Sequence, residues 1–243
     1  MRITLITLLT LFLAAGPLSA QWGRQKKIQG SGNLEKQERN LSENFTAVKA
    51  CCSMVVMVTK GDQLSVVVEA DDNLLQYIET DVFNGRLTIR RQKNINFESA
   101  ERVKVYVTMP EIDGLYASSS SDLLVTGEFR GDELDIDVSS SAEIEVNFTG
   151  ERVNVESSSS GRIRLSGSAD RLDADMSSSS RVAAEKFTTK RLKAEASSSG
   201  RITIDVTEEV DADVSSSGQV NYSGSPQKVF SDASSGGKVK KID

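Results

Sequence analysis

Hydrophobic and polar positions alternate in one repeating pattern through the second half of the chain. Between residues 115 and 243, an apolar anchor is followed two and four residues later by apolar or small side chains. This spacing predicts strands with one buried face, because successive side chains of a strand point to opposite sides. The anchors are Leu115, Leu134, Val153, Leu172, Leu192, Val210 and Val229, at steps of 19, 19, 19, 20, 18 and 19 residues. A repeat of this length is typical of a solenoid.

A serine cluster follows every anchor and marks a corner of the predicted coil. Five residues after the anchors lies a column formed by Ser120, Ser139, Ser158, Ser177, Ser197, Ser215 and Ser234. Eight residues after the anchor the side chain is usually tiny, as at Gly161 and Gly200, which suits a corner that needs room or a positive φ. Ten residues after it a β-branched residue returns, as at Val125 and Ile144. Each repeat therefore predicts a strand, a serine corner, a second strand and a turn.

Coils of this size are expected to stack into a parallel β-helix of about 19 residues per rung. Neighbouring rungs would lie about 4.8 Å apart and share backbone hydrogen bonds. Stacked serine hydroxyls could donate to one rung and accept from the other, each adding about 0.5–1.5 kcal/mol. Burying one leucine or valine contributes about 1.5–3 kcal/mol, so we expect the apolar columns to supply most of the stability.

The outward positions carry columns of charge. An acidic ladder lies three residues after the anchors: Asp137, Glu156, Asp175, Glu195, Asp213 and Asp232. Basic columns lie at Arg152, Arg171, Arg191 and Lys228, and at Arg162, Arg181, Arg201 and Lys238. We interpret these columns as a solvated surface whose opposite charges neutralise each other. The functional alternative is a carboxylate ladder that binds cations or glycans.

The first twenty residues read as a signal peptide, with Arg2 before an apolar run at 3–15 and a small-residue cleavage site ending at Ala20. The apolar run is short for a bilayer, so we expect an exported mature chain without a transmembrane span. We expect residues 21–41 to form a polar leader and residues 42–243 to form a single β-solenoid domain. Within it, 42–114 would form the first coils and a cap, and 115–243 the serine-rich rungs. A cap is expected because an uncovered end exposes unpaired strand groups.

Two local motifs stand out in the expected cap. Asp71, Asp72 and Asn73 could cap a short helix at 74–78. The turn at Asn84 and Gly85 lies between two strand-like runs, which predicts a hairpin.

The composition excludes several kinds of chemistry. The chain has no histidine, which removes Ser-His-Asp and Cys-His nucleophilic sites and the usual zinc sites. We therefore expect no catalytic residue, metal or cofactor. The two cysteines, Cys51 and Cys52, are adjacent and cannot join distant segments. We favour buried thiols, with intermolecular oxidation or a bond between the two neighbours as alternatives.

The charge balance bears on the partner. Removal of the signal peptide takes one of 29 basic residues, which leaves 28 against 35 acidic residues, a net charge of −7. Nucleic acid is a poor partner for such a surface.

Several stretches together give the sequence a resemblance to a known family. They are GSGN at 30–33, KGD at 60–62, VEADDNLLQYIET at 68–80, NGRLTIR at 84–90, VKVYVTMPEI at 103–112 and the serine-rich rungs. In these the chain resembles the bacterial auto-transporter adhesin head GIN domain family. The resemblance implies a right-handed β-helix-like solenoid, export from Gram-negative cells and an adhesive role. Cys51 and Cys52 depart from the family, whose members usually have glycine or serine there.

The leading hypothesis for function is an exported, non-enzymatic binding or structural protein that contacts a glycan or a protein at the cell envelope. A solenoid offers long faces for such contacts. The runner-up is a carbohydrate-active β-helix enzyme, although such enzymes need paired acids in a groove and this chain has few aromatic residues to stack on sugars. A third possibility is a periplasmic envelope sensor with a protein partner. Either compartment, the periplasm or the outer-membrane surface, fits the predicted export.

Overall fold

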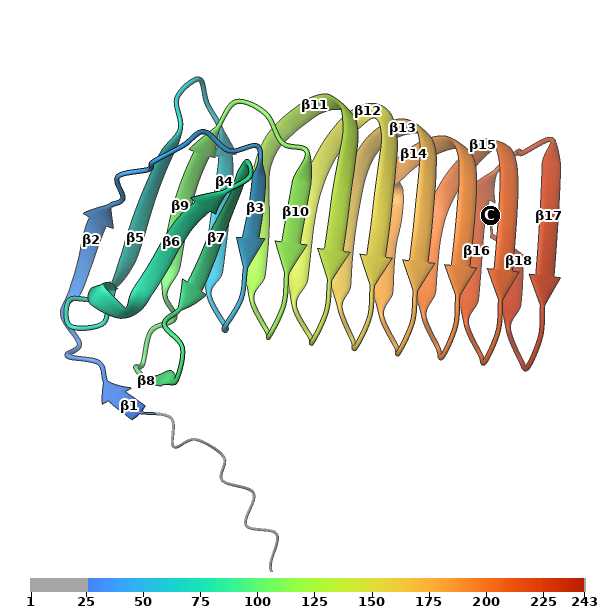
Figure 1. Ribbon diagram of the computed structural model, residues 1–243. Helices are drawn as coiled ribbons and strands as arrows, with labels where there is room; N and C mark the ends of the chain where they lie inside the picture. Colours follow the sequence, from blue (N-terminus) through green and yellow to red (C-terminus); the bar gives the residue numbers. More distant parts are fainter. Residues whose placement is uncertain (1–25, 243) are drawn as a thin grey trace, which may run out of the picture.

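The computed structural model describes residues 26–242, which form an elongated β-solenoid with a thicker N-terminal end (Figure 1). The predicted signal peptide and the first residues of the leader lie outside this range. The regular part consists of β10 (Gly114–Ala117), β11 (Asp122–Val138), β12 (Glu143–Ser157), β13 (Arg162–Met176), β14 (Arg181–Ala196), β15 (Arg201–Val214), β16 (Gln219–Gly224), β17 (Lys228–Ala233) and β18 (Lys238–Lys241). The predicted all-β solenoid is confirmed.

Each long strand of the regular part makes most of one coil. It starts after a serine corner, climbs the back wall, bends over the top and descends the front wall in a right-handed sense (Figure 1). Neighbouring coils pair in parallel along nearly their whole length, so that Leu134 lies beside Val153 and Val153 beside Leu172. This pairing places residues about one repeat apart in direct contact, as the anchor spacing predicted.

The inward columns form a continuous apolar core. Leu134, Val153 and Leu172 are fully buried. At the top bend, three phenylalanines fill the wider part of the core: Phe129, Phe148 and Phe187. Gly167 lies between Phe148 and Phe187 in the same column, with a φ of 110°. A Cβ atom there would collide with the Phe148 carbonyl, so the column needs a glycine at this position.

The register of the first rung differs from the prediction by two residues. Leu115 pairs with Ile136, not with Leu134. As a result Ser118, not Ser120, stands in the column of Ser139, and Leu123, not Val125, lies beside Ile144. Two extra residues are absorbed in a bulge between Leu124 and Glu128. The uniform spacing of the anchors does not hold here, because the bulge lengthens this coil by two residues and leaves the apolar pattern on either side unchanged.

The N-terminal coils are not stacked in chain order. Their strands are β3 (Ala47–Ala50), β4 (Val55–Lys60), β7 (Arg86–Arg91) and β9 (Lys104–Met109); β8 (Ile95–Glu98), between β7 and β9 in the chain, lies outside their sheet. β3 lies between β7 and β10 in the front wall, and β4 lies between β9 and β11 in the back wall. The coil of β3 and β4 therefore lies between two coils that both come later in the chain, one formed by β7 and β9 and the other by β10 and β11. Fully buried Val48 and Val56 hold this inner coil in the core.

The remaining N-terminal elements make up the cap region, in which buried Leu74 and Leu75 at the short helix close the end of the core. These elements are β1 (Lys26–Gln29), β2 (Leu34–Glu38), β5 (Ser65–Asp71), the 3-10 helix η1 (Leu75–Tyr77) and β6 (Ile78–Phe83). β2 pairs antiparallel with β5, and β5 with β9. β1 pairs in parallel with β8 in a separate two-stranded sheet. Part of the stretch predicted as a polar leader, 21–41, thus forms strands β1 and β2.

The local motifs of the cap are confirmed in outline. β6 and β7 form the predicted hairpin, with positive φ at both Asn84 and Gly85. The short helix is present as η1, but the predicted cap by Asp71, Asp72 and Asn73 is wrong. Leu74 holds the N-cap position and no side chain caps the helix, because Leu74 and Leu75 are drawn into the core instead.

Candidate binding face

The serine corners line up into a ridge along one edge of the solenoid. We call the first three residues of each corner, from 118–120 to 234–236, the serine ridge. Its second and third residues have φ near +50° to +65° in coil after coil, for example Ser140 at 53° and Ser141 at 61°. Two consecutive left-handed residues close each corner. The tiny residue that follows them supplies room, as predicted, but it does not carry the positive φ.

The corner serines are held together by their backbones. In each coil the N–H of the third serine donates to the carbonyl of the second serine of the next coil, as from Ser141 to Ser159 at 3.0 Å. None of the ridge hydroxyls makes a hydrogen bond within residues 26–242, so the predicted ladder of stacked hydroxyls is wrong. Only two serines at the fourth corner position, Ser121 and Ser180, turn inward and donate to carbonyls. The ridge therefore offers free hydroxyls to solvent.

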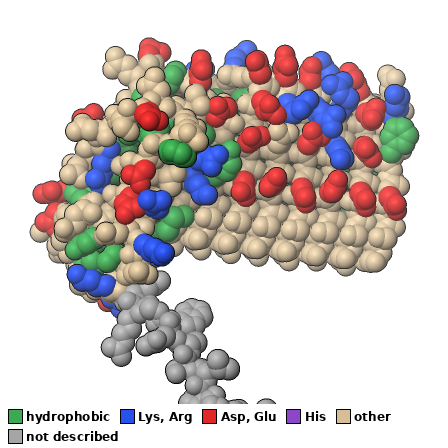
Figure 2. Space-filling view, in the orientation of Figure 1, with side chains coloured by type: hydrophobic (Ala, Val, Ile, Leu, Met, Phe, Trp, Pro, Cys, Tyr) green, Lys and Arg blue, Asp and Glu red, His purple; other side chains and the backbone are tan. Residues whose placement is uncertain are grey.

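The acidic ladder lies on the front wall, next to the ridge. The parallel pairing places its members in one column, in register from coil to coil, and all of them are exposed: Asp137, Glu156, Asp175, Glu195, Asp213 and Asp232. Figure 2 shows carboxylates in a row along the lower front face, above the charge-free corners. The predicted ladder is thus present as one straight line of like charge, with neighbours about 4.8 Å apart.

The ladder carboxylates are largely free of ion pairs. Among the ion pairs of the described chain, only Glu195 has a partner, Lys193 at 3.5 Å. The Arg171 guanidinium pairs with Asp173, and Lys228 pairs with Glu209, both outside the ladder. The charge columns therefore do not neutralise one another by direct contact in the way the sequence suggested. Five carboxylates remain open to a partner from outside: Asp137, Glu156, Asp175, Asp213 and Asp232.

Two basic columns lie on either side of this arrangement. Above the ladder on the front wall, Arg152, Arg171 and Arg191 pair in register. A second basic column lies on the back wall, just past the ridge, where Arg162, Arg181 and Arg201 pair in register. The strip formed by the ladder is bordered on the front wall by a further outward column that is itself mostly acidic and separates it from the arginines: Asp135, Asn154, Asp173, Lys193 and Asp211. An open groove crosses the middle of this strip, lined by side chains that include Asn154, Glu156, Asp173, Asp175, Lys193 and Glu195.

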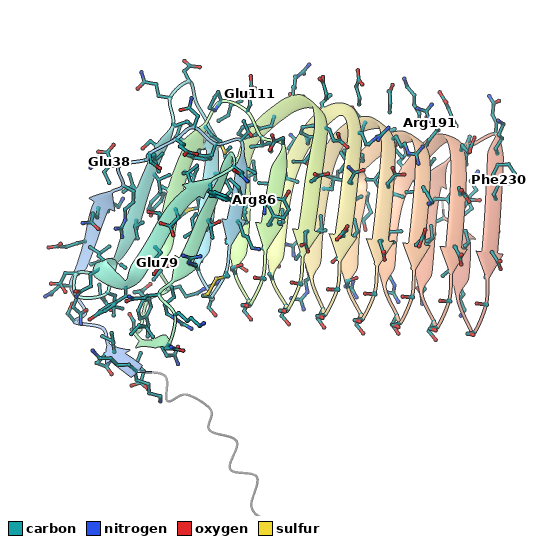
Figure 3. All side chains as sticks on the ribbon, viewed as in Figure 1. Glu38, Glu79, Arg86, Glu111, Arg191 and Phe230 are labelled. Carbon is teal, nitrogen blue, oxygen red and sulfur yellow. A yellow bond between two sulfur atoms is a disulfide. The ribbon has the colours of Figure 1, made fainter. Side chains whose placement is uncertain are left out.

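Tyr116 stands at the N-terminal head of the acidic column, where it pairs with Asp137. The Arg86 guanidinium lies 4.3 Å from the centre of the Tyr116 ring, and Figure 3 shows Arg86 at the junction of the cap and the regular coils. Burial raises the pKa of Tyr116; the charge of Arg86 opposes this rise, and Asp135 and Asp113 add to it. Sequence reasoning missed this residue, because the first-rung register placed Ser118 in the ladder column.

The two cysteines lie at the corner of the inner N-terminal coil, in line with the serine ridge. Cys52 and Ser53 have the same positive φ as Ser119 and Ser120 in the next coil. Cys51 and Cys52 are joined in a disulfide, and both side chains are partly exposed. The favoured prediction of buried thiols is therefore wrong, and the alternative of a bond between neighbours is the one observed. A corner that faces solvent cannot bury either side chain.

Residues 26–242 contain neither a cluster of metal ligands nor a helix that could span a membrane. No group of three or more His, Cys, Asp or Glu side chains in this range is placed to hold a metal ion, and the ladder runs along a line and does not converge on a point. No helix of the described chain has both the length and the apolar character needed to cross a bilayer.

Comparison with known proteins extends these observations. No curated protein matches the chain. Among solved structures, a putative adhesin from Bacteroides fragilis has 22% identity and a TM-score of 0.83, covering 88% of this chain and 100% of that one. A putative lipid binding protein from Parabacteroides distasonis has 21% identity, a TM-score of 0.75 and coverages of 90% and 100%. A putative adhesin from Parabacteroides merdae has 19% identity, a TM-score of 0.72 and the same coverages. At these identities the likeness shows the fold alone.

The family follows from a separate match to the sequence. Residues 44–226 match the family described as "Putative auto-transporter adhesin, head GIN domain". This range includes the inner N-terminal coil, most of the cap and all but the last of the serine-cornered coils. The resemblance found in the sequence motifs is thus confirmed, and the chain belongs to the auto-transporter adhesin head GIN domain family.

Proposed function

We propose that this chain is an exported, non-enzymatic binding protein of the cell envelope that holds its partner on the front wall of the solenoid. The observation that carries the proposal is the acidic ladder. It presents carboxylates in register on a rigid sheet, and all but Glu195 lack an ion pair. Membership of an adhesin head family supports a binding role, as do the names of two of the similar structures.

The ladder favours a partner with repeated positive charge. Its carboxylates share one side of the sheet, so a partner that contacts several of them gains from each contact at once. Exposed single ion pairs contribute little, about 0–1 kcal/mol each, so useful affinity requires several pairs together. A glycan bearing amino groups, or a lysine-rich or arginine-rich protein surface, meets this requirement. The free serine hydroxyls beside the ladder can add neutral hydrogen bonds.

A binding comparison of two matched variants tests this proposal. One variant neutralises five of the six ladder acids, through Asp137→Asn, Glu156→Gln, Asp175→Asn, Glu195→Gln and Asp213→Asn. The control variant neutralises five exposed acids elsewhere, through Asp132→Asn, Glu145→Gln, Glu151→Gln, Glu185→Gln and Glu208→Gln. Both carry the same net charge, so any difference in their binding to whole cells and to a glycan array reports the position of the charges.

We expect the ladder variant to lose at least about tenfold in affinity, equivalent to about 1.4 kcal/mol, while the control binds like the parent protein. Equal losses in both variants would mean that only net charge matters and would contradict the proposal. Incubation with a panel of polysaccharides checks the non-enzymatic part. Release of reducing ends or of unsaturated products would contradict it.

The location is tested separately by protease treatment of intact cells. Cleavage of the protein on intact cells places the binding face outside, and protection with recovery in a periplasmic fraction places it inside. In the second case, affinity capture from the envelope fraction identifies the partner more directly than adhesion assays. Recovery of the protein from the cytoplasm alone would contradict the proposed export.

A further inference from the structure

Within residues 26–242, the C-terminal end of the solenoid leaves its core uncovered. Every residue of β17 is exposed, and β17 pairs only with β15 within the described chain. Val210 in the preceding coil is fully buried, whereas Val229 in the same column is 44% exposed and its neighbour Phe230 is 55% exposed. The free edge of β17 therefore presents unpaired backbone groups beside apolar side chains, a combination that favours the addition of another strand.

The N-terminal end has a closed core, and its outermost strands have no further pairing partner among the described residues. Leu74, Leu75 and Ile78 close the interior, and β2 and β6 are the outermost strands of the back and front walls. Phe83 at the end of β6 is 74% exposed. In Figure 3 the labelled residues Glu79, on β6, and Phe230 lie at opposite ends of the molecule. Each end of the rod thus offers an edge strand with an exposed phenylalanine.

The two ends carry opposite charge. β17 and β18 contain four lysines and one aspartate, Asp232, which gives 4 − 1 = +3. On β2, Glu35 and Glu38 have no ion pair in the described chain, whereas Lys36 pairs with Glu69 on β5, and the β6 acids Glu79 and Asp81 pair with Arg90 on β7. The free charge at this end is therefore negative. Lysine on an edge strand discourages pairing between like ends, because the charges repel at close range. The same charges attract when the C-terminal end of one copy meets the N-terminal end of another.

We propose that the protein associates head to tail, with the free edge of β17 of one copy docked on the β6 and β2 end of a second copy. This contact joins two different surfaces, so each bound copy still has one end free and the assembly grows as a linear chain. The apolar part of each end is small, so the association is weak and depends on protein concentration and on salt. A row of such rods would extend the acidic ladder beyond one molecule.

Sedimentation velocity on the mature chain, over a range of concentrations, tests the proposal together with two charge-reversed variants. The first carries Lys238→Glu, Lys240→Glu and Lys241→Glu at the C-terminal end. The second carries Glu35→Lys and Glu38→Lys on β2, which have no ion pair in the described chain. We expect the parent protein to associate, and each variant alone to weaken association at least about tenfold, because its two ends now repel. An equimolar mixture of the two variants restores association, because their ends are complementary.

The control matched to the first variant places the same charge change in the middle of the rod, through Arg162→Glu, Arg181→Glu and Lys186→Glu. We expect it to associate like the parent protein, and raised salt to weaken the parent's association. Circular dichroism of every variant shows that the coils remain folded. The proposal would be overturned if the parent protein stayed monomeric at all concentrations. It would also be overturned if the mixture of the two charge-reversed variants did not associate.

Cross-linking reports the orientation and does not depend on the charge variants. In a background with Cys51→Ser and Cys52→Ser, one protein carries Phe230→Cys and the other Phe83→Cys. Head-to-tail association predicts a disulfide-linked dimer in the mixture and little in either protein alone. Efficient linkage of the Phe230→Cys protein to itself would show a symmetric contact between C-terminal ends and would overturn the proposal.

Discussion

The regular coils and the N-terminal coils have the same geometry but reach it by different chain paths. From β11 to β15 each strand pairs with the next strand along the chain, about one repeat away. In the N-terminal part, β3 pairs with β7 and with β10, which lie about 40 and 70 residues further along the chain. The comparison teaches that a sequence period reveals only those contacts whose separation equals the period. If the two regions are equally well packed despite these different paths, equivalent substitutions should destabilise both to the same extent.

The largest effect is expected in the middle of the regular coils. Phe148 is fully buried at the top bend, beside Phe129 and close to Gly167. Phe148→Ala should lower the free energy of unfolding by about 3–5 kcal/mol, because the neighbouring coils cannot collapse into the cavity. Urea unfolding followed by circular dichroism measures the loss. Phe230→Ala serves as the control, with a change within about 0.5 kcal/mol because the ring is already exposed.

An equal effect in both regions is expected for two valines. Val48 in β3 and Val153 in β12 are both fully buried, and each lies between two paired strands. Alanine at either position should cost about 2 kcal/mol, since both lose the same two methyl groups from a closed core. Urea titrations of the two variants provide the comparison. A much smaller cost at Val48 would mean that β3 lies at an edge of the solenoid and not inside it.

A smaller effect, dependent on pH, is confined to the cap. Glu69 on β5 is approached by Lys36 on β2 and by Lys104 and Tyr106 on β9. Burial acts to raise the pKa of Glu69, but the hydrogen bonds from Lys36 and Tyr106 and the two lysine charges together lower it. We expect Glu69→Gln to reduce stability at pH 7 by up to about 1 kcal/mol.

The sign of the pH dependence follows from the lowered pKa. The stabilisation from the Glu69 carboxylate is present above the unfolded-state pKa of about 4.3 and is lost as the pH falls through the native pKa. The difference between parent and Glu69→Gln should therefore shrink steadily below about pH 4. Urea unfolding of both proteins between neutral and acidic pH measures this difference. A gap that widens on acidification would contradict the assigned ion pairs.

The smallest effect is expected at the cysteine corner. The disulfide joins adjacent residues, so it closes almost no loop and constrains the unfolded chain little. The equivalent corner of the next coil has serines with the same left-handed backbone. Replacing Cys51 and Cys52 by serine should therefore change the free energy of unfolding by no more than about 0.5 kcal/mol, measured under oxidising conditions.

Much of the regular region could be predicted from the sequence. The anchors, the serine corners and the acidic ladder all follow from one period, because parallel coils in register convert sequence spacing into contact. The two-residue bulge before Glu128 was missed, since a bulge leaves the alternation on either side intact. The free state of the ridge hydroxyls was also missed, since sequence places a serine at a corner but does not fix the direction of its Oγ.

The N-terminal region could be predicted only in parts. The hairpin at Asn84 and Gly85 has a local signal, because both residues tolerate positive φ. The position of β3 between β7 and β10 has no such local signal, because the paired strands are far apart in the chain and share no sequence repeat. Most ladder carboxylates have no ion pair in the described chain, and this too could not be predicted. It depends on the conformations that long, flexible side chains adopt on the surface, which the assignment of residues to columns does not determine.

Paired cysteine substitutions test the strand order directly, in a background where Cys51 and Cys52 are serine. Lys49 on β3 pairs with Thr88 on β7 and with Tyr116 on β10. The account predicts that Lys49→Cys forms a disulfide with Thr88→Cys in one protein and with Tyr116→Cys in another, because paired residues lie within bonding range. The combination of Thr88→Cys with Tyr116→Cys should remain reduced, because β3 separates the two. Efficient linkage of Thr88→Cys to Tyr116→Cys would contradict the nested order of the coils.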